Sequence, residues 1–168
     1  MEPKRFFFTD DGKIPNNKLP LLVYKNVFEE RDIKGAEWLE KRFEQNNWSN
    51  SWRNGVFEYH HYHSNTHEVL GVYSGEALLH LGGEEGEKIK VSAGDIIVIP
   101  AGVGHKKLKS YNGFKIVGAY PNGSDYDINT GRKGERPGTD ENIAALPIPE
   151  SDPLQGDSNG VPQIWSET

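Results

Sequence analysis

Two stretches of the sequence concentrate side chains that can bind a metal ion. Residues 55–75 read GVFEYHHYHSNTHEVLGVYSG, and residues 94–105 read GDIIVIPAGVGH. Residues 55–63 carry no helix signal and predict a strand, in which alternate residues share a face. His61 and His63 therefore point the same way, with Cα atoms roughly 7 Å apart. This spacing suits two imidazoles that converge on one ion.

Two further ligands complete the predicted site. A polar turn at residues 64–66 leads into a second strand, which we expect to fold back as a hairpin with Glu68 at its start. His105 follows a turn at residues 100–102, after the apolar run 96–99. Three imidazoles and one carboxylate suit one borderline divalent metal: Mn, Fe, Co, Ni, Cu or Zn. An octahedral ion would keep two positions open for water, dioxygen or substrate.

The other histidines are expected outside this site. By strand parity His60 faces away from its neighbour, and His67 faces away from Glu68. His80 alternates with leucines and is expected on the outer face. A helical pair of His63 and His67 would need a helix through the intervening turn. The β-branched and aromatic residues on both sides of that turn disfavour it.

These residues resemble the two motifs of the cupin superfamily. The first, G-x5-H-x-H-x4-E-x6-G, is matched without a gap from Gly55 to Gly75, and the second, G-x5-P-x-G-x2-H-x3-N, from Gly94 to His105. Lys109 replaces the final Asn of the second motif. That Asn is not a metal ligand in the family, so the departure concerns the pocket and not the ligand set. The segments FFFTDDGKIPNN, HYHSNTHEVLGVYSG and GAYPNG also resemble the YjlB-type cupins of bacteria.

The resemblance implies an all-β fold, a double-stranded β-helix (jelly-roll) barrel. Nineteen glycines and ten prolines also favour short strands and turns over long helices. Each motif occurs once, so we expect one cupin domain over residues 1–168. Its core barrel covers about residues 52–121, with an N-terminal arm and helix at 1–51 and an extended C-terminal arm at 122–168.

The pattern along the chain predicts the elements around the site. We expect barrel strands at residues 55–63, 68–74, 76–81, 88–91, 96–99 and 114–120, and arm strands at 5–9 and 19–24. A helix is expected over residues 32–47, with Asp32 as its N-cap. Its apolar stripe comprises Ile33, Ala36, Leu39 and Phe43. Trp48, Trp52 and Arg53 are expected in a loop.

The C-terminal arm contains five prolines that prevent long regular elements: Pro137, Pro147, Pro149, Pro153 and Pro162. Apolar islands at residues 143–148 and 164–165 are unusual in a disordered tail. They predict an extended arm that packs over the barrel or over a partner subunit.

Composition limits the partners. The net charge is −6 and no basic cluster occurs, so neither nucleic acid nor anionic membrane is an expected partner. The absence of cysteine excludes disulfide and thiolate chemistry. No apolar run approaches the roughly 20 residues of a membrane span. We therefore expect a cytoplasmic protein whose ligand is a small molecule.

Parity also predicts the pocket walls. Phe57 and Tyr59 share a face with the paired histidines, and Leu70 and Val72 share a face with Glu68. A mostly apolar cavity with a few polar groups is the usual small-ligand site. Tyr59 is either a hydrogen-bond donor to the substrate or a packed core residue.

Two lysines share parity with His105. If Lys107 and Lys109 face the cavity, they favour an anionic substrate such as a carboxylate or a sugar phosphate. The alternative is a solvated strand end, which the adjacent Lys106 supports. Lys107 and Tyr59 are accordingly the candidate catalytic residues.

Three functions remain open at this level. A metal-dependent enzyme would be a dioxygenase with Fe(II), or an isomerase or lyase with another ion. A binding or sensing module would hold metal and ligand without turnover. A storage jelly roll would not need the intact ligand set. We also expect a homodimer, because jelly-roll sheet edges need cover and the two arms can supply it.

Overall fold

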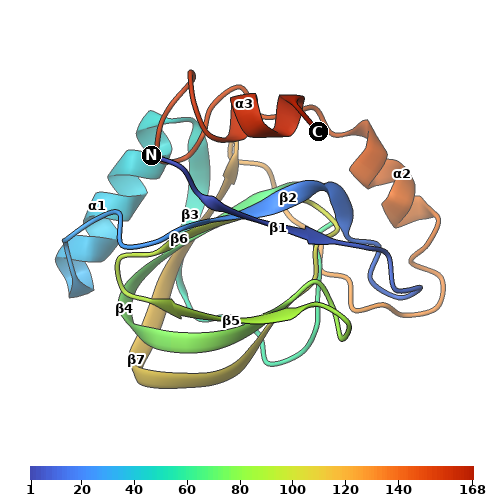
Figure 1. Ribbon diagram of the computed structural model, residues 1–168, viewed down its shortest axis with the longest axis horizontal. Coiled ribbons are helices and arrows are strands. Elements are labelled where there is room, and N and C mark those ends of the chain that lie inside the picture. The colour runs from blue at the N-terminus through green and yellow to red at the C-terminus, as the bar shows by residue number, and fades with distance from the viewer.

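The computed structural model describes residues 1–168 as a β-barrel jelly roll with three helices (Figure 1). The strands are β1 (Lys4–Phe8), β2 (Asn17–Tyr24), β3 (Trp48–Asn54), β4 (Glu68–Leu81), β5 (Glu87–Ser92), β6 (Ile96–Ile99) and β7 (His105–Pro121). The helices are α1 (Asp32–Gln45), α2 (Gly138–Ala145) and α3 (Val161–Ser166). The all-β prediction is confirmed.

All strand pairs are antiparallel, in the order β1-β2-β6-β4-β7-β3, and β5 pairs with β4. The first half of β4 pairs with β6 and its second half with β5, while β7 runs beside both halves. The bend between them lies at Gly75, which has a φ of +68°. A Cβ there would lie 2.5 Å from the carbonyl oxygen of Tyr111, so the close approach requires glycine. What the sequence predicted as two strands is one bent strand.

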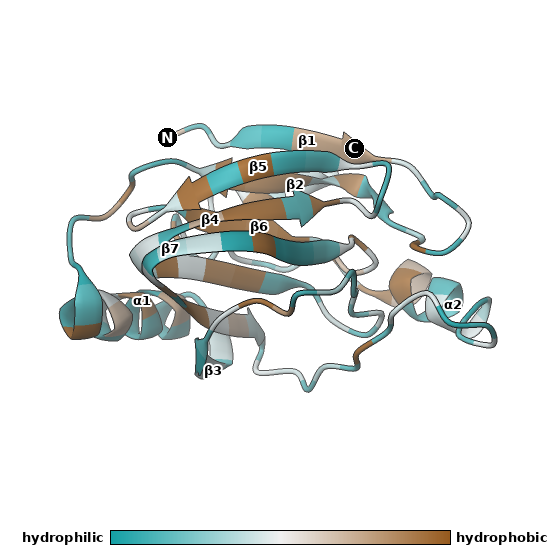
Figure 2. Cartoon of the chain, turned by 90° about the horizontal axis from the view of Figure 1, so that it is seen from below, coloured by the Kyte–Doolittle hydropathy of each residue, from teal (hydrophilic) through white to brown (hydrophobic).

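Strand parity divides the apolar residues between two clusters. On β2, Leu21 and Val23 belong to the barrel interior, whereas Leu22 and Tyr24 belong to a cluster on the opposite face. β6 contributes to both clusters, which explains its uninterrupted apolar sequence. On β5, which lies at the barrel's edge, hydrophilic and hydrophobic residues alternate (Figure 2).

Helix α1 covers the outer cluster. Its buried residues include Ala36, Leu39 and Phe43. Leu39 approaches β4 so closely that a Cβ on Gly71 would lie 2.5 Å from its Cδ2 atom. Ile33 is 60% exposed and was wrongly assigned to the apolar stripe. Asp32 is the first helical residue and makes no capping hydrogen bond, so the N-cap prediction was also wrong.

Residues 48–63, which include the start of the first motif, differ most from expectation. Trp48, Trp52 and Arg53 lie in β3 and not in a loop, whereas residues 55–63 form no continuous strand. His61 makes an isolated bridge with His105, and Tyr62 makes one with Asn129. Because His61 and Tyr62 are neighbours but pair with different segments, neither pairing continues into a regular β-ladder. The predicted hairpin between residues 55–63 and β4 is absent, because β4 pairs with β5, β6 and β7.

The C-terminal arm packs against the barrel of its own chain (Figure 1). Leu154, Val161, Ile164 and Trp165 join the outer cluster beside α1. The predicted extended arm therefore contains two short helices, α2 and α3, between its prolines. No helix combines the length and apolar character needed to cross a membrane.

Candidate metal centre

The first motif and the start of β7 bring three histidines together inside the barrel. His61, His63 and His105 are at most 5% exposed, and one ring nitrogen of each lies within 4.8 Å of the others. The two antiparallel backbone hydrogen bonds between His61 and His105 hold these two residues side by side. The rings of His61 and His105 have centroids 4.0 Å apart.

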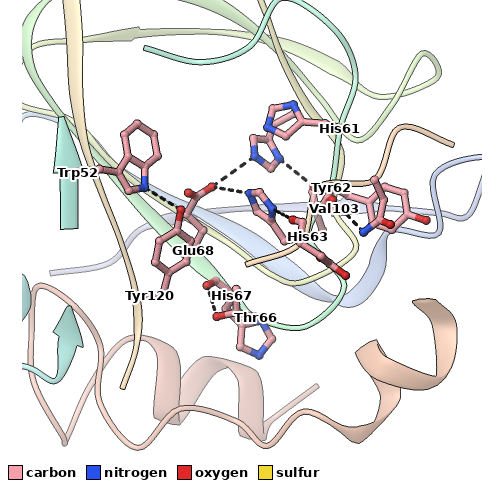
Figure 3. Close-up of polar contacts among 12 residues, drawn as sticks. Trp52, His61, Tyr62, His63, Thr66, His67, Glu68, Val103 and Tyr120 are labelled. Carbon is pink, nitrogen blue, oxygen red and sulfur yellow. Dashed lines mark hydrogen bonds and ion pairs between the residues drawn. The ribbon is translucent and has the colours of Figure 1, made fainter. Parts of the chain in front are cut away.

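Glu68, the first residue of β4, supplies the only carboxylate of the cluster (Figure 3). Its Oε1 atom lies 3.2 Å from Nε2 of His63 and 3.4 Å from Nε2 of His105. The side chain is 2% exposed. The structure thus brings together all four residues that the sequence predicted as ligands.

The three histidines share one orientation. The Nδ1 atoms of His61, His63 and His105 lie 3.1, 2.5 and 3.1 Å from the backbone carbonyls of Tyr59, Asp127 and Val103. A carbonyl only accepts, so each Nδ1 carries a proton, and the neutral form of each ring presents an Nε2 lone pair. Metal-binding histidines are usually oriented in this way by a second hydrogen bond.

Protons alone cannot satisfy all of these converging atoms. Nε2 of His105 is buried and has no hydrogen-bond partner. In the neutral form, Nε2 of His63 faces the Glu68 carboxylate, so two acceptors confront each other at 3.2 Å. One proton could bridge only one such pair, whereas one cation with several coordination positions satisfies all four groups. The donor set therefore fits a metal ion.

Burial and neighbouring charges shift the pKa values of His61, His63 and Glu68. Burial, reinforced by the neighbouring His105, lowers the pKa of His61 to about 2, which keeps its imidazole neutral. Burial alone would lower the pKa of His63, but the Glu68 carboxylate outweighs burial and raises it. Burial would raise the pKa of Glu68, but His63 and His105 hold it below its usual range. Glu68 is therefore ionised at neutral pH.

A cavity of about 110 Å³ opens beside the cluster. It is lined by Trp52, Asn54, Gly55, Val56, Phe57, Leu70, Tyr120 and Tyr126, together with the four candidate ligands. Phe57 and Leu70 lie where parity placed them. Val72 belongs to the barrel interior, and Tyr59, which is 46% exposed, stacks on the outer side of Phe57. Neither residue lines the cavity.

No lysine or arginine lines this cavity. The ammonium of Lys107 lies 3.9 Å from the carboxylate of Glu58, which is a surface residue. An anionic substrate would therefore not meet Lys107 among the cavity walls.

Two tyrosines that sequence analysis did not single out lie at the cavity. Tyr120 on β7 accepts a 2.7 Å hydrogen bond from Nε1 of Trp52 (Figure 3). Tyr126 stacks on Tyr120 with ring centroids 4.9 Å apart. Burial and the neighbouring Glu68 carboxylate raise the pKa of Tyr120. Its hydroxyl therefore stays protonated at neutral pH. Parity along the strand 114–120 could have placed Tyr120 on a face, but not opposite Glu68.

Comparison with known proteins agrees with this geometry. A model of the cupin domain matches residues 53–107. The chain is 46% identical over 165 residues to the uncharacterized protein YjlB of Bacillus subtilis (strain 168), covering 98% of this chain and 97% of that protein. The chain belongs to the cupin family.

Solved structures resemble this cupin more distantly. The acireductone dioxygenase of Bacillus anthracis, solved with a cadmium ion in its active centre, matches with 15% identity and a TM-score of 0.44, covering 63% of this chain and 80% of its own. Procruciferin, an 11S globulin of Brassica napus, matches with 25% identity and a TM-score of 0.38, covering 48% of this chain and 21% of its own. At such TM-scores neither likeness bears on the activity of this cupin.

The remaining histidines lie apart from the site. His67 points away from the histidine cluster (Figure 3). The centroid of its ring lies 4.8 Å from that of Trp165. Its Nδ1 accepts a hydrogen bond from the backbone of Ala101. His80 was expected on the outer face and does not join the apolar interior, but it is only 4% exposed. It lies against His60, which covers it.

Proposed function

We propose that this cupin is a metal-dependent enzyme that acts on a small, oxygen-containing molecule. The observation that carries the proposal is the convergence of three buried imidazoles and the Glu68 carboxylate, with Nε2 of His105 left without a hydrogen-bond partner. His61, His63, His105 and Glu68 would hold one divalent transition metal. The bound ion would supply Lewis-acid polarisation of an oxygen substrate or, as iron, reactivity toward dioxygen.

The cavity limits the size of the substrate. Its volume of about 110 Å³ is well below the ~300–1,000 Å³ typical of sites for drug-sized ligands. It suits a small acid or the reactive end of a longer molecule. Because no cationic side chain lines the cavity, preference for an anion would depend on the ion itself.

Tyr120 is the polar group best placed to orient such a substrate. The Trp52 indole donates to the Tyr120 oxygen, and the raised pKa keeps the tyrosine a donor. Its hydroxyl could then donate to Glu68 or to a bound oxygen atom. Phe57, at the entrance of the cavity, is 44% exposed and would shield the substrate from water. Tyr59 and Lys107, the candidates from the sequence, would act only from outside this lining.

The test uses protein purified without a histidine tag and stripped with a chelator. Fe(II), Mn(II), Ni(II) and Zn(II) are loaded in turn, and each form is screened against carboxylic acids, diketones, phenols and sugar phosphates. Oxygen uptake and product formation are followed. We expect turnover with one ion, and a raised KM or lowered kcat in Tyr120→Phe at unchanged metal content. Tyr111→Phe, at an exposed site on the same strand, is the matched control.

The second candidate function is ligand binding without reaction, which the small cavity also permits. If a ligand binds at micromolar affinity in a metal-dependent manner, yet no metal form converts it, the cupin is a metal-dependent binding or sensing module. If the purified protein takes up no metal at all, both proposals fail.

A further inference from the structure

A second group of metal-ligating side chains lies on the outside of the barrel. His60, His80 and Glu84 each offer one ligand atom, and these atoms lie within 4.8 Å of one another. His60 belongs to the irregular segment 55–63 of the first motif, His80 to the second half of β4, and Glu84 to the turn between β4 and β5. None of them lines the cavity of the candidate metal centre.

The three side chains of this group already contact one another through His60. Nε2 of His60 lies 2.8 Å from Oε2 of Glu84, and the rings of His60 and His80 meet edge to face with centroids 4.8 Å apart. Nδ1 of His60 is buried and has no hydrogen-bond partner. Two imidazoles and one carboxylate form a common ligand set for zinc, with a fourth position left for water.

Exposure differs among the three residues: His80 is 4% exposed, His60 is half-buried, and Glu84 lies at the surface. Neutral imidazoles and an ionised carboxylate are the forms that bind metal. We propose that His60, His80 and Glu84 form a second binding site for a divalent transition metal such as zinc.

Two lysines make this site weaker than the buried one. Lys88 and Lys106 are the cross-strand partners of His80 on β5 and β7, so both present charge near the ion. The single carboxylate of Glu84 is the only anionic ligand opposing them. The buried histidine cluster should therefore fill first and the His60–His80–Glu84 site second.

The position of the site suggests what the second ion does. It would connect the irregular segment 55–63 to the turn between β4 and β5. That segment carries Phe57, which lines the cavity, and His61, which directly follows His60. An ion held by His60 would thus fix the wall of the cavity from outside, without touching the substrate.

Zinc titration of the chelator-stripped, untagged chain tests the proposal. Isothermal titration and elemental analysis after desalting should give two zinc ions per wild-type chain. Glu84→Gln should weaken the second site by at least about tenfold and leave the first intact. Glu85→Gln removes the adjacent exposed acid and should leave both sites intact.

The two sites can be separated in the reverse direction. His61→Ala/His105→Ala should retain one zinc ion, which raises the melting temperature and is lost on adding Glu84→Gln. Circular dichroism establishes that this variant folds. Should it misfold, the single variant Glu84→Gln still decides the matter in the otherwise intact chain. A wild-type stoichiometry of one, or a second ion that survives both Glu84→Gln and His60→Ala, would overturn the second site without affecting the first.

Discussion

Nδ1 of His63 donates a 2.5 Å hydrogen bond to the backbone carbonyl of Asp127, which lies 64 residues away in the sequence. The Asp127 carboxylate accepts hydrogen bonds from the backbone N–H and the hydroxyl of Ser64, the residue after His63. The loop after β7 therefore fixes the orientation of a candidate ligand on a distant segment.

Asp127→Ala should accordingly weaken metal binding. Without its carboxylate the loop loses its hold on Ser64, and the backbone carbonyl of residue 127, which alanine retains, is held less firmly against Nδ1 of His63. Substitution of such supporting groups typically costs about 10–100-fold in metal affinity. Competition titration against a chelator measures the effect, and Asp125→Ala in the same loop is the control. Equal affinities of the two variants would show that His63 needs no support from this loop.

The ligand set is tested by single alanine substitutions. His61→Ala, His63→Ala, Glu68→Ala and His105→Ala should each remove most of the metal from the buried site, because each deletes one of four converging donors. His67→Ala should retain it, because that ring faces Trp165. Elemental analysis of untagged protein measures occupancy. An unchanged occupancy of the buried site in His61→Ala/His105→Ala would falsify the assignment.

The C-terminal arm should be essential for stability. Trp165 is 1% exposed, packs in the outer cluster and donates a 2.9 Å hydrogen bond from Nε1 to the carbonyl of Pro20 on β2. Trp165→Ala should lower the free energy of unfolding by about 3–5 kcal/mol, as for other large aromatic residues in cores. Ile148→Ala, at a site 37% exposed in the same arm, should cost much less. Urea denaturation compares the two.

Acid should weaken one link between the two arms. Arg136 pairs with both Asp10 and Asp140, and this pairing lowers the pKa of Asp10 from its ordinary 3.8 to about 2. A carboxyl with a depressed folded-state pKa stabilises the fold above its unfolded pKa and loses that contribution as pH falls through the folded value. The difference in melting temperature between wild type and Arg136→Met should therefore be constant near neutral pH and shrink between about pH 4 and pH 2. A difference that does not change with pH would contradict this role.

Association is the remaining expectation. β1 and β3 are the outermost strands of the sheet order, and exposed strand edges favour pairing with another chain. We predict a homodimer, which sedimentation velocity at micromolar concentration would detect. A monomer under those conditions would contradict the prediction. The arm packing described above stabilises each chain whether or not it dimerises.

The sequence alone determined the family and the candidate ligands. The fixed spacing of His61, His63, Glu68 and His105 among glycines and a proline is a local property that the chain carries in any conformation. Strand β6 was predicted to the residue, because four consecutive branched apolar side chains between turn residues fit only a strand buried on both faces. Parity also placed Leu70 correctly on the face that lines the cavity.

Only the tertiary structure decided how those residues meet. His61 and His63 converge because His61 bridges to His105, Tyr62 bridges to Asn129 and His63 bonds to the Asp127 carbonyl, and not through the regular strand that parity assumed. Tyr120 comes opposite Glu68, and His60 comes against His80, because β7 and the β4–β5 turn fold next to those segments. Such pairings join residues far apart in sequence, and their free energy depends on neighbours that no local pattern specifies. The motif therefore predicted which residues bind the metal, whereas the long-range contacts determined how those residues are arranged.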